Sequence, residues 1–175
     1  DASDFLAERE AVAAAMCKIY ALRLTTASGG NISLRLPGDR CAITPGGGDK
    51  AATAAAQIAV VSLAGENLIP GVRPSSEFRM HLAIYRRCPR VKAIVHAHPP
   101  TASAFTAAAT PILADLTAEA YAIVRRVVVV PYALTGTEAL GELCADAACE
   151  ANCLLLENHG ATTLGGTLHE AFNRL

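Results

Sequence analysis

Two histidines lie two residues apart at the end of an apolar run, in the stretch KAIVHAHPP. Side chains at positions i and i+2 of a strand point to the same face, so we expect His96 and His98 to direct both imidazole rings into one space. Imidazole nitrogens are ligands of zinc and of several other divalent metals. The pair is therefore either part of a metal site or two unrelated core or surface histidines.

A catalytic zinc usually has three protein ligands and one open position, so a third ligand is required. His159 is the best candidate, because it follows the apolar run CLLLEN and precedes a glycine. A polar turn of that kind often carries functional residues. His81 falls inside a predicted helix and His169 at a predicted helix start, which makes both of them weaker candidates.

Three short segments favour the binding of an anion. TTASGGNIS and ITPGGGDK are glycine-rich loops beside predicted strands, and such loops present backbone N–H groups to phosphate or carboxylate. The third segment, RPSSEF, opens a predicted helix, where the hydroxyls of Ser75 and Ser76 and the helix dipole favour negative charge. Each segment alone is an ordinary turn or cap, but together they predict an anion pocket.

Glu77 lies in the first turn of that same helix. A carboxylate at a helix N-terminus is favoured by the dipole whatever its function, so its position alone does not assign a role. If the helix end faces a metal, the carboxylate can ligate the ion or move a proton at a carbonyl substrate.

The composition is that of one soluble domain large enough to bury a core. The chain has 175 residues, of which 52% are hydrophobic and 18% charged, and its net charge is −1. The 15 basic residues are balanced by 16 acidic ones and form no cluster larger than YRRCPR, which argues against nucleic-acid binding. No apolar run is long enough for a membrane span and the start of the chain is acidic, so we expect a cytoplasmic protein.

The periodicity of apolar residues predicts a mixture of helices and strands. Helices are expected at residues 4–24, 77–88, 101–109 and 137–151, with the start of another at 167–172. Strands are expected at 31–36, 91–96, 127–133 and 153–158, with a short strand and glycine loop at 41–50 and a hairpin over 58–69. Residues 112–124 are ambiguous, 159–166 are expected to turn into the last helix, and Ser75 or Ser76 is expected to cap the second helix. The pattern suggests an α/β or α+β sandwich.

Five motifs give the chain a resemblance to the class II aldolase/adducin family, whose members include L-fuculose-1-phosphate aldolase. In order they are SGGN, ITPGG, RPSSEFRMHLAIYRRCP, VKAIVHAHPP and LLLENHG, and the resemblance covers essentially the whole chain. It implies an α/β fold, a three-layer α/β/α sandwich around a mostly antiparallel sheet, in a single domain over residues 1–175 that lacks its C-terminal tail. It also implies a homotetramer with active sites at subunit interfaces.

The resemblance further implies roles for individual residues. One divalent metal ion per subunit, zinc in the first place with manganese or cobalt as alternatives, would be held by His96, His98 and His159. Glu77 matches the acid/base residue of the family's SSE motif. The phosphate of the substrate would be held at the positions matching Gly30, Asn31, Gly46, Gly47, Ser75 and Ser76.

A second acid is needed at the aldehyde oxygen, and the resemblance implies that a neighbouring subunit supplies it. The family places a tyrosine or an acidic residue for this purpose in the segment after the paired histidines. In this chain the candidates are Asp115, Glu119 and Tyr121, and Glu119 is our first choice.

The expected function is that of a metal-dependent class II aldolase. It would cleave a ketose phosphate resembling fuculose 1-phosphate to dihydroxyacetone phosphate and an aldehyde. A sugar-phosphate 4-epimerase, or a metal-dependent decarboxylase of a sugar acid or aromatic acid, would use the same site. Because Gly46 stands where phosphate-binding members often have a hydroxyl side chain, a carboxylate is an alternative anion. A non-catalytic adducin-like module is disfavoured, because it has no need of three histidines and Glu77.

Overall fold

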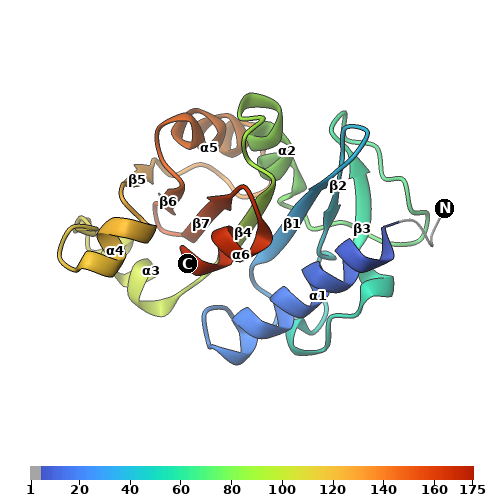
Figure 1. Ribbon diagram of the computed structural model, residues 1–175, viewed down its shortest axis with the longest axis horizontal. Coiled ribbons are helices and arrows are strands. Elements are labelled where there is room, and N and C mark those ends of the chain that lie inside the picture. The colour runs from blue at the N-terminus through green and yellow to red at the C-terminus, as the bar shows by residue number, and fades with distance from the viewer. Residues whose placement is uncertain (1–4) are drawn as a thin grey trace.

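Seven strands form one sheet between two layers of helices in the computed structural model, which describes residues 5–175 (Figure 1). The strand order is β3-β2-β1-β4-β7-β6-β5. Neighbouring strands are antiparallel except for β5 and β6, which are parallel. The predicted α/β sandwich around a mostly antiparallel sheet is therefore confirmed. The strands are β1 (Asn31–Leu36), β2 (Arg40–Ile43), β3 (Ala59–Ser62), β4 (Ala93–Ala97), β5 (Val127–Val130), β6 (Cys153–Leu156) and β7 (Gly160–Gly165).

The helices α2 and α5 cover one face of the sheet, and α1 and α6 cover the other (Figure 1). Within residues 5–175, no helix is both long enough and apolar enough to cross a membrane. The predicted start of the first helix at Asp4 lies outside the described residues. The helices are α1 (Leu6–Ala21), α2 (Phe78–Arg87), α3 (Pro100–Ala107), α4 (Ala118–Ile123), α5 (Glu138–Glu150) and α6 (Leu168–Asn173), with short 3-10 turns η1 (Lys50–Ala52) and η2 (Ala55–Gln57).

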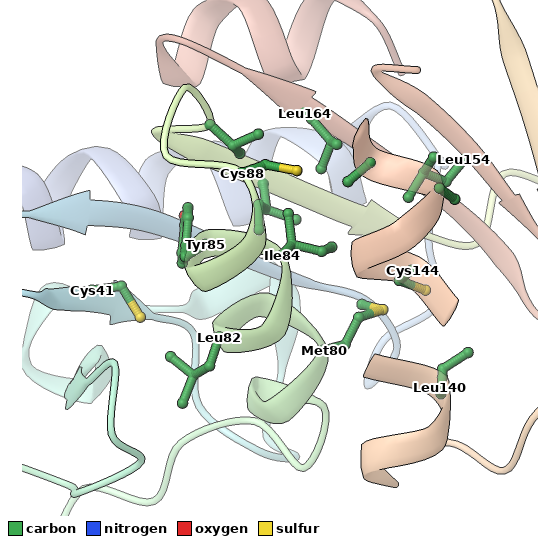
Figure 2. Packing of buried hydrophobic residues seen from close by; sticks show 14 of the residues in the cluster. Cys41, Met80, Leu82, Ile84, Tyr85, Cys88, Leu140, Cys144, Leu154 and Leu164 are labelled. Atoms are coloured by element: carbon green, nitrogen blue, oxygen red, sulfur yellow. The ribbon is translucent and has the colours of Figure 1, made fainter. Parts of the chain in front are cut away.

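The layer of α2 and α5 is held by a continuous apolar cluster (Figure 2). Met80 and Ile84 of α2, Leu140 and Cys144 of α5, and Leu154 of β6 are all buried in it. In each helix the two residues are four apart and so lie on the same face. Burying each large aliphatic side chain contributes about 1.5–3 kcal/mol, which anchors α2 firmly on the sheet.

Strand β1 presents apolar side chains to one layer and polar ones to the other. Ile32 packs with Val12 and Met16 of α1. Its neighbours Asn31 and Ser33 point the opposite way and form hydrogen bonds with residues at the start and middle of α2. This alternation places polar groups beneath α2, where an all-apolar strand would have extended the hydrophobic core.

The central strand β7 is the main departure from the sequence prediction. Residues 159–166 were expected to form only a turn, and that prediction is wrong, because Gly160–Gly165 form a fully buried strand between β4 and β6. A Cβ at Gly160 would lie 2.5 Å from the carbonyl oxygen of Ala97 and 2.7 Å from Cδ2 of His98. The close approach of β4 therefore requires glycine there, and glycine obscures the strand pattern.

The start of α2 also differs from the prediction, because neither Ser75 nor Ser76 is its cap residue. The helix begins at Phe78 with Glu77 at the cap position, and the Glu77 side chain makes no capping hydrogen bond. Ser75 Oγ accepts the N–H of Glu77 at 3.3 Å instead. The Glu77 carboxylate is thus available to the sheet below the helix.

Candidate functional site

Three histidines meet at one end of the central strands. His96 lies on β4, His98 follows that strand, and His159 lies in the turn between β6 and β7. One ring nitrogen from each lies within 4.8 Å of the other two. The i, i+2 spacing directs the first two rings into one space, as expected. His159 joins them because β7 pairs with β4, with Thr162 opposite His96.

The proton on His96 can be assigned from its hydrogen-bond partners. Nδ1 lies 3.0 Å from the carbonyl oxygen of Ala161 and 2.9 Å from Thr162 Oγ1. A carbonyl oxygen only accepts, so Nδ1 carries the proton and Nε2 keeps its lone pair. Burial lowers the pKa of His96 well below its usual value, and the nearby His159 and His98 lower it further. The ring is therefore neutral at pH 7, which is the form that binds a metal.

The Glu77 carboxylate faces the same three rings. Its Oε2 lies 3.4 Å from Nε2 of His96, and its Oε1 lies 3.5 Å from Nε2 of His159. Nε2 of His98 lies 3.2 Å from Nε2 of His96. Burial also lowers the pKa of His98, with His159 as the next contribution. The Glu77 carboxyl group and the three imidazole rings thus converge on a common space, and two of these rings, those of His96 and His98, have lowered pKa values.

This donor set fits a divalent metal ion. Oε1 of Glu77 and Nδ1 of His159 are buried side-chain atoms that have no hydrogen-bond partner among the described residues. Buried polar atoms are nearly always paired, so the orphaned Oε1 of Glu77, which lies 3.5 Å from Nε2 of His159, indicates a site for a ligand. Three imidazole nitrogens with an adjacent carboxylate are a common donor set for catalytic zinc.

A chain of buried polar side chains lies on the other side of Glu77. Asn31 Nδ2 donates to Glu77 Oε2 at 2.8 Å, and Asn31 Oδ1 lies 2.5 Å from Nε2 of His81. His81 Nδ1 lies 2.7 Å from Ser33 Oγ, which is 2.8 Å from the hydroxyl of Tyr85. From the sequence, His81 is only a weak candidate, and Ser33 and Tyr85 are not among the candidates. The available signal was the spacing of Glu77, His81 and Tyr85, four residues apart on one helix face.

The predicted anion-binding segments lie against one another. Gly46 N–H donates to the carbonyl of Arg73 at 3.1 Å, and a Cβ on Gly46 would lie 2.9 Å from Pro74 O. The missing side chain at this position therefore allows the loop to approach the segment before α2. Ser75 is buried and Ser76 is exposed.

Gly30 occupies the other glycine loop, with φ of +72°. A Cβ there would lie 2.8 Å from the carbonyl oxygen of His96, so the loop depends on glycine. Gly47 also has a positive φ, of +73°, and a Cβ there would have no neighbour within 4 Å. Both glycine loops thus bring backbone, rather than side chains, to the site end of the sheet.

Lys50 was also missed by sequence reasoning. It is buried, its backbone N–H donates to Ala27 O at 2.9 Å, and its Nζ donates to Pro45 O at 3.0 Å. Burial lowers the pKa of Lys50. Lys50 thus joins the two glycine-rich loops, through its backbone N–H to one and its side chain to the other, and adds a basic group beside them. Its position two residues after the glycine run is the only signal in the sequence.

The three candidates for a second acid lie elsewhere. Asp115 and Glu119 are exposed, and Tyr121 on α4 is 66% exposed. Over residues 5–175, no hydrogen bond or ion pair joins any of them to the three histidines or to Glu77. The structure therefore brings together the predicted metal ligands and Glu77 within one chain, but it does not bring these three residues to them.

Comparisons with known proteins agree with this geometry. The family model for the Class II Aldolase and Adducin N-terminal domain matches residues 10–175. The L-fuculose phosphate aldolase of Methanococcus vannielii is 37% identical over 154 residues, which cover 88% of this chain and 82% of that protein. The 3-oxo-tetronate 4-phosphate decarboxylase of Haemophilus influenzae is 31% identical over 170 residues, which cover 95% and 80%.

Solved structures show the same similarity. YgbL from Escherichia coli superimposes on the chain with a TM-score of 0.89 at 29% identity, covering 97% of this chain and 83% of that one. The two curated relatives are named for different reactions. The similarity therefore indicates the family of the chain but does not identify its reaction or its substrate.

Proposed function

Because the chain belongs to the class II aldolase and adducin family, we propose that it is a metal-dependent lyase that breaks a carbon–carbon bond near a carbonyl group of a phosphorylated sugar. The favoured reaction is retro-aldol cleavage of a ketose phosphate to dihydroxyacetone phosphate and an aldehyde. The observation that carries this proposal is the convergence of His96, His98 and His159 on the carboxylate of Glu77.

The three histidines would hold the metal, with zinc as the first expectation and manganese or cobalt as alternatives. A divalent cation bound there supplies Lewis-acid stabilisation of the negative charge that develops on the carbonyl oxygen of the substrate. His96 can serve as a ligand without losing a proton, because its Nδ1–H is already committed to Ala161 O. The ligand set is therefore prepared before substrate arrives.

Glu77 would move the proton at carbon. When the C3–C4 bond breaks, its electron pair stays with C3 and is delocalised onto the C2 carbonyl oxygen. C3 must then gain a proton to become the hydroxymethyl group of dihydroxyacetone phosphate. The Glu77 carboxyl group would deliver this proton, and its distances of 3.4 Å to His96 and 3.5 Å to His159 support this role.

A second group must take the proton from the C4 hydroxyl as the aldehyde forms. Asp115, Glu119 and Tyr121 remain our candidates, and we propose that a neighbouring subunit of a homotetramer contributes one of them. The exposed apolar side chains of the same segment support this proposal, since Leu116 is 74% exposed and Leu113 is 55% exposed. Apolar surface of this kind commonly marks a site of association.

The phosphate would be held by the glycine loops and the segment before α2, at Gly30, Gly46, Gly47, Ser75 and Ser76, whereas the Asn31 side chain of the same predicted set already donates to Glu77. The nearby basic group of Lys50 supports an anionic substrate group. The Gly46 N–H already donates to Arg73 O, so the other N–H and hydroxyl groups would bind the anion directly.

Decarboxylation of a phosphorylated 3-oxo acid is the second candidate, favoured by the similarity to a 3-oxo-tetronate 4-phosphate decarboxylase. The bond that breaks then joins the carbonyl-bearing fragment to a carboxylate, and carbon dioxide leaves. Glu77 would again protonate the carbon left behind. No hydroxyl proton has to be removed, so this reaction does not need the second acid.

The direct test is to incubate the metal-loaded protein with a panel of ketose phosphates and phosphorylated 3-oxo acids. Dihydroxyacetone phosphate is measured with a coupled dehydrogenase, carbon dioxide is measured separately, and epimers are resolved by chromatography. We expect dihydroxyacetone phosphate from a ketose phosphate. Release of carbon dioxide alone would assign the decarboxylase, an epimer alone would assign the 4-epimerase, and no product from any substrate would refute the lyase proposal.

A further inference from the structure

The polar chain that starts at Glu77 contains five buried residues. The donor and the acceptor can be assigned in each of its hydrogen bonds. Relative exposures are 7% for Glu77, 2% for Asn31, and 0% for His81 and Ser33. Tyr85, at the far end, is also fully buried. Each member therefore depends on the others for its hydrogen bonds, because water does not reach them.

The direction of the chain follows from what each atom can do. An ionised carboxylate only accepts, so Asn31 turns its Nδ2 toward Glu77 and its Oδ1 toward His81. An amide oxygen also only accepts, so Nε2 of His81 must carry the ring proton. Burial lowers the pKa of His81 to about 3, so the ring is neutral and its Nδ1 is an acceptor.

The last two links agree with this direction. Ser33 donates its hydroxyl proton to His81 Nδ1 at 2.7 Å and accepts from the Tyr85 hydroxyl at 2.8 Å. The other acceptor within reach of Tyr85 is the Lys92 carbonyl at 3.4 Å, which is beyond the usual O–H···O distance. The Tyr85 proton therefore points to Ser33.

We propose that Asn31 is a positioning residue for Glu77, and that His81, Ser33 and Tyr85 hold the Asn31 amide in the one orientation that donates to the carboxylate. The inference rests on the proposed function of Glu77 and refines it. Oε2 is tied to Asn31, whereas Oε1 has no hydrogen-bond partner and faces His159. Oε1 is therefore the oxygen that Asn31 leaves free to face the site.

This role differs from the one that the family resemblance implied for Asn31. An anion-binding side chain would contact substrate, and its loss would raise KM. A positioning side chain leaves substrate binding intact and acts through the carboxylate, so its loss lowers kcat. The two roles thus make opposite predictions for the same substitution.

The first test is kinetic and uses Asn31→Asp, which keeps the shape of the side chain and replaces the donor by an acceptor. We expect kcat to fall about 10-fold to 100-fold, the usual cost of losing a supporting contact at such a site, with KM and metal content unchanged. The matched control is Asn152→Asp, which makes the same change at an amide that accepts from Arg90 near the surface. A raised KM with unchanged kcat in Asn31→Asp would overturn the inference.

The second test is spectroscopic and needs no substrate. Nitrogen-15 NMR of the wild-type holoenzyme should show His81 as the Nε2-protonated neutral tautomer at pH 7, with the signal assigned by its loss in His81→Gln. Ser33→Ala should mix the two tautomers and lower kcat roughly threefold to tenfold, the worth of one hydrogen bond. Ser62→Ala removes a hydroxyl that accepts from Glu66 N–H in an exposed turn, and should change neither signal nor kcat.

The outcomes separate this inference from the function on which it rests. A wild-type protein without turnover on any substrate would overturn the proposed function, and with it the positioning role of Asn31. If the wild-type protein is active but His81 carries its proton on Nδ1, only the assigned direction of the hydrogen bonds is overturned. If Asn31→Asp does not fold, the tautomer of the wild-type protein and the kcat of Ser33→Ala still decide the matter.

Discussion

The histidine end of the sheet and the α3–α4 segment differ in almost every physical property, although both carry residues proposed for one reaction. At the histidine end, His96 is fully buried and Glu77 is 7% exposed, and each makes a hydrogen bond that fixes its orientation. In the other segment, Leu116 is 74% and Tyr121 is 66% exposed. Asp115 and Glu119 are exposed beside them.

The difference separates the proposed site residues that the single chain holds in fixed positions from those that it leaves exposed on its surface. Three histidines and Glu77 are held by strands and by α2, so their geometry does not depend on anything outside the chain. The candidates for the second acid lie on a short helix and the loop before it, whose positions relative to the histidines would be set by an oligomer.

The largest effect is expected for His96→Ala, which removes a ligand from the preorganised half. The wild-type protein should bind close to one divalent ion per chain, and the variant should lose both this ion and turnover, because two imidazoles hold a metal far more weakly than three. Elemental analysis of the purified proteins measures this. His169→Ala, at an exposed position of α6, is the control and should bind metal normally. Full metal content in His96→Ala would place the ion elsewhere.

Glu77→Gln should separate metal binding from proton transfer. The amide has the same shape but cannot carry the proton, so we expect turnover to fall about 100-fold to 10,000-fold while metal content stays near that of the wild type. Steady-state kinetics and elemental analysis of one preparation measure both. Wild-type turnover in this variant would remove Glu77 from the mechanism.

The contrast between the two regions is sharpened by three conservative variants of the exposed segment, Asp115→Asn, Glu119→Gln and Tyr121→Phe. We expect one of them, Glu119→Gln in our first choice, to lose about 10-fold to 1,000-fold in aldol cleavage. Stability should change by less than about 0.5 kcal/mol, because all three positions are exposed.

Mixed oligomers test whether that residue acts across an interface. Subunits carrying His96→Ala and subunits carrying the inactive exposed-segment variant are unfolded together and reassembled. If each site combines residues of two chains, some mixed sites contain both intact groups, and part of the activity returns. A mixture that stays as inactive as its parents would contradict a shared site.

The smallest effect is a pH dependence of stability that comes from the buried half. His81 has a folded-state pKa of about 3 against an ordinary value of 6.5, so the unfolded chain binds its proton first as the pH falls. The stabilisation that neutral His81 contributes to the folded state is present above pH 6.5 and is lost as the pH decreases toward 3. Between pH 6.5 and pH 5 the free energy of unfolding should fall by about 2 kcal/mol through His81.

Urea unfolding at the two pH values measures this loss. His81→Gln cannot take up the proton, so its free energy of unfolding should depend less steeply on pH than that of the wild type. His169→Gln, on the surface, should keep the wild-type slope. Equal slopes in all three proteins would mean that His81 titrates normally.

Much of the fold could be predicted from the sequence because burial of one face produces a regular pattern. NISLRL and VKAIVH predicted β1 and β4, and the apolar spacing in residues 77–88 predicted α2. Convergence of His96 and His98 could be predicted for the same reason, since side chains two apart on a strand share a face. In contrast, β7 was missed because its small residues and terminal glycines carry no alternation.

The polar chain could not be predicted because its members have no pattern when taken singly. A histidine inside a helix is usually an ordinary surface or core residue, and His81 was interpreted so. His81 belongs to the polar chain only because Asn31 and Ser33, two residues apart on β1, lie opposite Glu77 and Tyr85 at α2. That pairing of a strand with a helix is a tertiary fact that spacing along the chain does not contain.

The place of β7 in the sheet has a consequence for how the protein is made. This strand separates β4 from β6 but follows both of them in the sequence, so the edges that β4 and β6 turn toward each other stay unpaired until β7 has been synthesised. Insertion of β7 closes both edges, and it also delivers His159 and the Ala161 carbonyl that orients His96. We therefore expect the metal site to form only once β7 has been inserted, so that metal affinity distinguishes molecules with a complete sheet from folding intermediates without β7.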